Sequence, residues 1–204
     1  YGHLHTGSIA ATLEPGGSAV LDAVRRIKPT ATVSYDPNIR PALMGTPGHV
    51  RDRVEELVGL SDLVKVSDED LAWLYPDEPV EAIMRRWITS GPAMVVVTRG
   101  PGGADALLAG NRDMLRIDQL SVKLADTVGA GDSFMAGLIA GLLDAGLLGS
   151  PDARQRLREA GWSHVQSALH NAVVTSGLTV SKHGAYAPTP DEVAAVKQAD
   201  PRLS

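Results

Sequence analysis

The apolar run AMVVVT at residues 93–98 constrains the fold of this chain more than any other segment. Successive side chains of a strand point to opposite faces, and here nearly all of them are apolar and three are β-branched valines. This pattern is typical of a strand buried on both sides. Such a strand belongs to a parallel sheet that has helices on each face. We therefore predict an α/β fold.

Other strands and helices alternate along the chain before this run. Short apolar runs at 31–35 and 63–66 predict strands, whereas residues 19–27, 50–58 and 79–88 have the spacing of amphipathic helices. This alternation implies βαβ units. The predicted fold is a three-layer αβα sandwich with a mostly parallel central sheet.

Smaller elements follow in the carboxyl-terminal half. Short segments at 104–109, 114–117 and 121–123 predict a small antiparallel addition to the sheet. A long helix over 153–176 and a short last strand over 178–181 are expected after the apolar helix described below.

Four loops with unusual polar chemistry fall at the predicted carboxyl ends of strands or next to them. Ligands of open α/β sheets bind at that edge. We therefore expect one cleft to contain all four loops, although each loop taken singly can lie there by chance. The loops are residues 36–41, 67–70, 98–103 and 126–132.

The last of these loops leads directly into an apolar helix, since residues 126–143 read DTVGAGDSFMAGLIAGLL. Gly129 and Gly131 allow backbone angles that turn successive N–H groups toward one point, and a helix start carries partial positive charge. These properties predict an anion site. Asp132 in the first turn would repel a bound phosphate, but it suits a general base for a hydroxyl that attacks one.

An anion site beside a carboxylate predicts a kinase. The alternative is that Asp132 only caps the helix and the glycines only allow a tight turn.

The composition excludes several classes of protein. With 44% hydrophobic and 21% charged residues, the chain is in the ordinary globular range, and we expect one α/β domain over residues 1–204. A formal net charge of −5 without a dense basic cluster argues against a nucleic-acid partner. The absence of cysteine excludes a disulfide scaffold, and no apolar run approaches the roughly 20 residues of a membrane span. We expect a cytoplasmic protein that binds small molecules and no membrane.

Several motifs resemble the ribokinase-like, or PfkB, family of carbohydrate kinases, and within it most closely the fructokinases. DTVGAGDSFMAG at 126–137 is similar to the family's carboxyl-terminal signature over its whole length. VTRGPGGA at 97–104 resembles the nucleotide-binding strand and turn, and residues 184–190 resemble the carboxyl end. DPNIRPAL at 36–43 looks like the loop of fructokinases and of 2-keto-3-deoxygluconate kinases.

The resemblance covers nearly the whole chain and implies the carboxyl-terminal two thirds of an ATP-dependent sugar kinase. The amino-terminal third, with the sugar-binding segment and the lid sheet, is missing from this chain by that comparison. The resemblance implies that Asp132 deprotonates a primary hydroxyl, with fructose as the first candidate acceptor, while the amides of Gly129, Ala130 and Gly131 hold the charge on the γ-phosphoryl group.

The resemblance also implies contacts to the nucleotide. Family members have an Asn-x-x-Glu motif where this chain has SDED at 67–70, a change that keeps a hydroxyl and a carboxylate but shortens both. The candidate nucleotide-binding residues are Thr98, Gly100, Gly103, Ser67 and Asn171.

Two residues and two ions complete the implied site. Asn38 and Arg40 would face the phosphates from the opposite side, although a surface salt bridge is an alternative for Arg40. Mg²⁺ would be held mostly by ATP phosphates and water. Asp126 is the candidate ligand of a potassium ion, and the alternative is a carboxylate that stabilises the turn.

Two other functions stay open. The loop at 36–43 equally suits a 2-keto-3-deoxygluconate kinase, and a chain without its lid is also consistent with a catalytically silent nucleotide-binding module. Dimerisation through the lid is common in the family, so a homodimer is a further expectation of the resemblance.

Overall fold

A six-stranded sheet forms the centre of the structure, a computed structural model that describes residues 1–203. The strands lie side by side in sequence order. The first four run parallel, and the last two are each antiparallel to the strand before. The strands are β1 (His3–Gly7), β2 (Thr32–Asp36), β3 (Leu63–Ser67), β4 (Met94–Thr98), β5 (Ala104–Leu108) and β6 (Leu115–Ile117). The predicted mostly parallel sheet with its antiparallel addition is thus confirmed.

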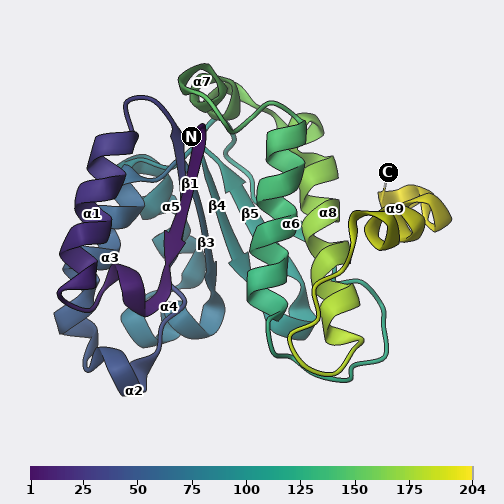
Figure 1. The fold of residues 1–204 in the computed structure, drawn as a ribbon, viewed down its shortest axis with the longest axis horizontal. Helices are drawn as coiled ribbons and strands as arrows, with labels where there is room; N and C mark the ends of the chain where they lie inside the picture. The colour runs from purple at the N-terminus through teal and green to yellow at the C-terminus, as the bar shows by residue number, and fades with distance from the viewer. Residues whose placement is uncertain (204) are drawn as a thin grey trace.

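Helices cover both faces of the sheet and give three layers (Figure 1). One layer contains α1, α3, α4 and α5, the other contains α6 and α8, and α9 packs beyond α8. None of the helices in residues 1–203 has both the length and the apolar character of a membrane span. The helices are α1 (Gly16–Ile27), α2 (Pro41–Met44), α3 (Pro47–Leu60), α4 (Asp68–Leu74), α5 (Val80–Ser90), α6 (Ala130–Asp144), α7 (Pro151–Glu159), α8 (Trp162–Val180) and α9 (Pro190–Ala199).

Alternate side chains of the central strands pack into two separate cores. On β4, Val95 and Val97 belong to the core beneath α1, α3, α4 and α5. Met94 and Val96 on the same strand belong to the core beneath α6 and α8. Because successive side chains point to opposite faces and both faces are covered, every position of this strand before Thr98 is buried and apolar.

The carboxyl ends of the four parallel strands lie at one edge of the sheet, with the ends level within the pairs β1/β2 and β3/β4. The register pairs Gly7 with Asp36 and Ser67 with Thr98. The loops that follow β2, β3 and β4 therefore begin at one edge of the sheet, where a ligand site of this fold class is expected.

Three predicted elements were wrong. The helix predicted over 153–176 is two helices, α7 and α8, and the segment 121–123 forms no strand. The strand predicted over 178–181 is the last turn of α8 and the residue after it. Thr179 indicates the reason, because its hydroxyl donates to Ser133 Oγ on α6 at 2.7 Å. Packing against α6 outweighs the local β-propensity of this segment.

Candidate active site

The start of α6 has unpaired backbone donors. Gly129 has φ +78°, a left-handed conformation that glycine adopts without strain, and its carbonyl accepts the Ser133 amide at 2.8 Å. Among the described residues, the amides of Gly129, Gly131 and Asp132 have no hydrogen-bond acceptor. The amide of Ala130, which the resemblance assigns to the same group, donates instead to the Thr127 carbonyl at 3.2 Å. Free donors at a helix start form a site for an anion.

The carboxylate of Asp132 stands exposed in the first turn of α6. It lines a cavity of about 360 Å³ between α6 and the ends of β1 and β2. The other lining residues are His5, Thr6, Gly7, Ser8, Ala10, Asp36 and Asn38. The side chain is thus turned away from the core and toward a space that admits a small molecule.

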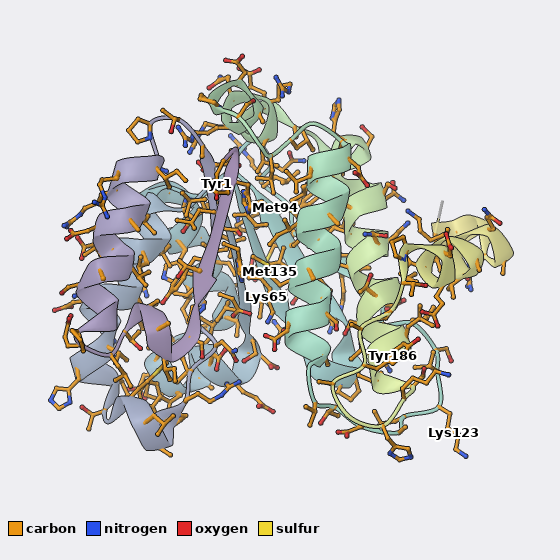
Figure 2. All side chains as sticks on the ribbon, in the orientation of Figure 1. Tyr1, Lys65, Met94, Lys123, Met135 and Tyr186 are labelled. Carbon is orange, nitrogen blue, oxygen red and sulfur yellow. The ribbon has the colours of Figure 1, made fainter. Side chains whose placement is uncertain are left out.

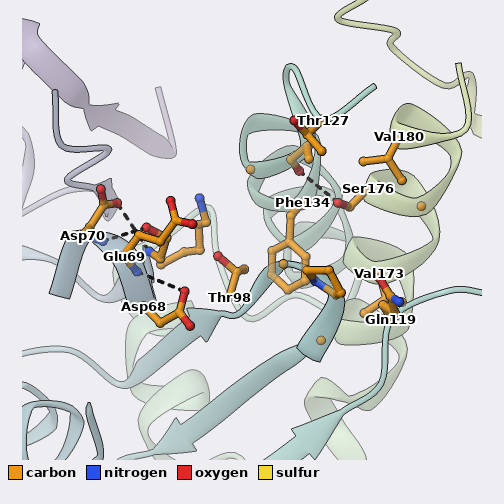
Figure 3. Close-up of a pocket in the computed structure, with 18 of the residues that line it drawn as sticks. Asp68, Glu69, Asp70, Thr98, Gln119, Thr127, Phe134, Val173, Ser176 and Val180 are labelled. Carbon is orange, nitrogen blue, oxygen red and sulfur yellow. Dashed lines mark hydrogen bonds between the residues drawn. The ribbon is translucent and has the colours of Figure 1, made fainter. Parts of the chain in front are cut away.

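A larger cavity of about 590 Å³ lies on the other side of the α6 start. All four polar loops predicted at the sheet edge line it, which confirms that one cleft contains them. Figure 3 shows the acidic side chains Asp68, Glu69 and Asp70 at one end, with Phe134 and Val180 at the other. The cavity therefore has an acidic end and an uncharged end with apolar side chains.

The residues at the ends of β3 and β4 line the larger cavity as predicted. Ser67 Oγ accepts the Asp70 amide at 3.0 Å while the Asp70 carboxylate accepts the Ser67 amide, so these two residues form a capping box at the start of α4. Burial raises the pKa of Asp70 above its usual value. Thr98, Gly100 and Gly103 lie opposite. At Gly103, with φ +79°, a Cβ would meet the Ile117 carbonyl at 2.1 Å, so only glycine fits there.

Asn38 and Arg40 follow β2 on the loop that separates the two cavities. Asn38 borders both cavities and has φ +42°, an uncommon angle for a residue with a side chain. Arg40 borders the larger cavity, where its guanidinium donates to the Ile39 carbonyl at 2.9 Å. No carboxylate of the described residues pairs with Arg40, so the alternative of a surface salt bridge is not supported.

Two predicted site residues make structural contacts. The Asp126 carboxylate accepts the amides of Val128 at 3.1 Å and Gly184 at 2.9 Å, and these bonds hold its pKa below the usual value. This is the turn-stabilising arrangement that the sequence left as an alternative. Asn171 donates from its side-chain amide to the Gly137 carbonyl at 2.8 Å and joins α8 to α6. It does not line the larger cavity, so its predicted adenine contact has no support in this geometry.

The described residues contain no cluster of three histidine or carboxylate side chains with metal-binding geometry. The carboxylates of Asp68, Glu69 and Asp70 are the acidic groups that border the larger cavity. A hard cation would fit here only if other oxygen atoms, such as those of phosphates and water, supplied most of its ligands.

Two further residues of the site, Lys65 and His5, were not predicted from the sequence motifs. Lys65 lies on β3, is 4% exposed and lines the larger cavity. A lysine in the middle of the apolar strand LVKVS is the signal that points to it. His5 lines the smaller cavity with its Nδ1 at 2.9 Å from Ser34 Oγ, and burial lowers its pKa.

A model of the pfkB family of carbohydrate kinases matches residues 3–192 of this chain. Fructokinase from Klebsiella pneumoniae is 38% identical over 146 residues, which are 71% of this chain and 47% of that protein. Fructokinase from Rhizobium leguminosarum bv. trifolii is 35% identical over 140 residues, 68% of this chain and 42% of that protein. The chain spans about half the length of these curated relatives.

Solved structures of fructokinases are also similar to this chain. A fructokinase double mutant from Vibrio cholerae O395, with fructose, ADP and potassium ion bound, has a TM-score of 0.79 at 28% identity and covers 95% of this chain and 59% of that one. Fructokinase with bound ATP from Xylella fastidiosa has a TM-score of 0.84 at 22% identity, covers 97% of this chain and 61% of that one, and shows the shared fold. The predicted ribokinase-like fold is confirmed, and the chain belongs to the pfkB family of carbohydrate kinases.

Proposed function

We propose that this chain is the nucleotide-binding and base-carrying part of an ATP-dependent sugar kinase that phosphorylates a primary hydroxyl of fructose. The observation that carries the proposal is the start of α6, where the exposed Asp132 carboxylate stands beside the free amides of Gly129 and Gly131. A cavity lies on each side of this point. A base and an anion site between two cavities suit the transfer of a phosphoryl group from a donor to an acceptor.

The larger cavity suits the nucleotide. Its volume of about 590 Å³ is in the range of small-molecule sites. The uncharged end near Phe134, Val173 and Val180 suits a flat base, while Thr98 and the turn after it would border ribose and phosphates. The γ-phosphate would then approach the free amides at the start of α6.

The smaller cavity suits the acceptor sugar, because Asp132 lines it together with polar groups of β1 and β2. In the proposed step, the acceptor oxygen attacks the γ-phosphorus and its proton goes to the Asp132 carboxylate. The bond between the γ-phosphorus and the bridging oxygen breaks, and ADP leaves with that electron pair. The free amides of Gly129 and Gly131 stabilise the charge on the phosphoryl oxygens during the transfer.

Mg²⁺ fits this proposal as an ion held mainly by the ATP phosphates, with Asp68, Glu69 and Asp70 as the acidic groups that face it through water. When bound, it would neutralise part of the phosphate charge. A potassium ion beside the 126–129 loop is a second proposal, since the Asp126 oxygens keep lone pairs besides those that accept the two amides.

Fructose is the proposed acceptor because the Klebsiella and Rhizobium relatives are fructokinases. The test is an assay of ADP formation with Mg²⁺ and ATP across a panel of sugars that includes fructose and 2-keto-3-deoxygluconate. The proposal requires fructose to be the better substrate. Higher turnover with 2-keto-3-deoxygluconate would reassign the acceptor.

A silent nucleotide-binding module is the second candidate, because the chain spans only about half of its curated relatives. Calorimetric titration with ATP and Mg²⁺, combined with the assay of sugar turnover, separates the candidates. Binding of ATP without turnover of any sugar would favour the silent module for this chain, whereas turnover excludes it.

A further inference from the structure

Lys65 is a buried cation at the boundary between the two cavities. It lies on β3, two residues after Leu63, and therefore faces the same side of the sheet as α6. Figure 2 shows Lys65 in the space between the sheet and α6. A Cβ built on Gly131 would lie 2.9 Å from Lys65 Nζ, so the ammonium group stands directly beside the start of α6.

Asp36 is the single partner of this ammonium group among the described residues. Asp36 Oδ2 lies 2.8 Å from Lys65 Nζ, and both side chains are 5% exposed. Asp36 borders the smaller cavity and Lys65 borders the larger one. The ion pair therefore forms part of the partition between the two spaces.

The ammonium group has unused hydrogen-bonding capacity. It carries three donors, and only the contact to Asp36 is made within residues 1–203. A buried donor without an acceptor is costly, and Lys65 lines a cavity into which the remaining N–H groups can donate. The free amide of Gly131 is next to it and that of Asp132 follows in the chain, so two kinds of donor, an ammonium group and backbone amides, lie at the start of α6.

We propose that Lys65 donates to the γ-phosphoryl oxygens of ATP and is a catalytic residue of the transfer, with Asp36 holding its ammonium group at the partition. This inference rests on the function proposed above. A compact cation at this point offsets the charge of the phosphoryl group on the side that faces the sheet. The Asp36 carboxylate keeps the cation from being an unpaired buried charge before the nucleotide binds.

The experiment compares ATP and ADP binding by calorimetry at fixed Mg²⁺ concentration. The main variant is the double substitution Asp36→Asn with Lys65→Met, which removes both charges and leaves no unpaired carboxylate. We expect ATP affinity to fall about 10-fold or more, the size of a hydrogen bond to a charged group, while ADP affinity changes little. Lys197→Met is the matched control, because Lys197 on α9 contacts Ser167 on α8 and neither residue lines either of the two cavities, so both affinities should be unchanged.

Asp36→Asn alone gives an independent measurement, since it keeps the cation and removes its partner. The ratio of ATP to ADP affinity in Asp36→Asn should equal or exceed that of the wild type. An unchanged ratio of ATP to ADP affinity in the double variant would overturn the role of Lys65 and leave the proposed kinase intact. Failure of the wild-type chain to bind either nucleotide would overturn both.

Discussion

The Asp126 carboxylate accepts a hydrogen bond from the amide of Gly184, 58 residues later in the chain, at 2.9 Å. Its other oxygen accepts the Val128 amide, so one side chain joins the loop before α6 to the loop after α8. The loop that carries Gly129 is therefore held in place from outside its own segment.

Substitution of Asp126 by alanine should loosen this loop and slow the proposed phosphoryl transfer by about 10–100-fold, because the proposed anion site loses its preorganised geometry. Asp126→Asn keeps one acceptor oxygen and should give a smaller loss. Initial rates in potassium chloride and in tetramethylammonium chloride measure both the loss and any dependence on potassium. Asp113→Ala, in an exposed loop, is the control. A normal rate in Asp126→Ala would exclude this role.

Asp132→Asn tests the proposed base. The amide side chain cannot take the proton of the acceptor hydroxyl, so kcat should fall by about 100–10,000-fold with little change in ATP affinity. Coupled assays of ADP formation and calorimetric ATP titrations provide the two values. Asp144→Asn at the exposed carboxyl end of the same helix should leave both unchanged. If Asp132→Asn keeps a near-normal rate, Asp132 has no part in the mechanism.

Arg154→Met tests the ion cluster around the buried Asp62 at the opposite edge of the sheet. Asp62 is 1% exposed and accepts the Arg154 guanidinium at 2.7 Å and the Val33 amide at 2.8 Å. Removal of the guanidinium should lower the free energy of unfolding by about 3 kcal/mol, the low end for a broken buried pair, because Lys28 stays 3.5 Å from Asp62. Urea denaturation measures the loss.

Arg156→Met is the matched control on the same helix, since within residues 1–203 Arg156 donates only to the Gly146 carbonyl at the surface. Equal losses in the free energy of unfolding of the two variants would show that the ion pair between Arg154 and Asp62 does not stabilise the fold more than a surface contact does.

His3 predicts a pH dependence of stability. Burial, together with the nearby His5, lowers its pKa from 6.5 to about 4. Since the folded state then binds fewer protons than the unfolded state between these values, stability should fall as the pH decreases from about 6.5 to about 4. Above pH 6.5 both states are neutral at this residue and it has no effect.

His3→Gln removes this titrating group and keeps a polar side chain near Thr32 and Ser34, the partners of His3. Urea denaturation at pH 7.5, 5.5 and 4.5 should show a smaller loss of stability for the variant than for the wild type. Parallel pH profiles would mean that His3 does not contribute.

Local patterns were sufficient for much of the fold and for the position of the cleft. The run at 93–98 forms β4 because β-branched apolar side chains suit a strand covered on both faces. The capping box of Ser67 and Asp70 was also predictable, since it depends on two residues three positions apart.

Contacts between distant segments were not predictable in this way. Asn171 bonds to the Gly137 carbonyl, and the 178–181 segment is mostly helical because α8 packs along α6. Lys65 shows the same limit, because the charge itself was visible in an apolar strand but its partner Asp36 lies 29 positions away.

The sequence by itself determined the α/β class, the four polar loops and the glycine-flanked start of α6, because these depend on backbone angles and on the periodicity of side chains over a few residues. Only the tertiary structure decided which amides are free, which cavity Asp132 faces and which charge Lys65 meets. Those properties depend on distances between segments far apart in the chain, which local residue patterns do not specify.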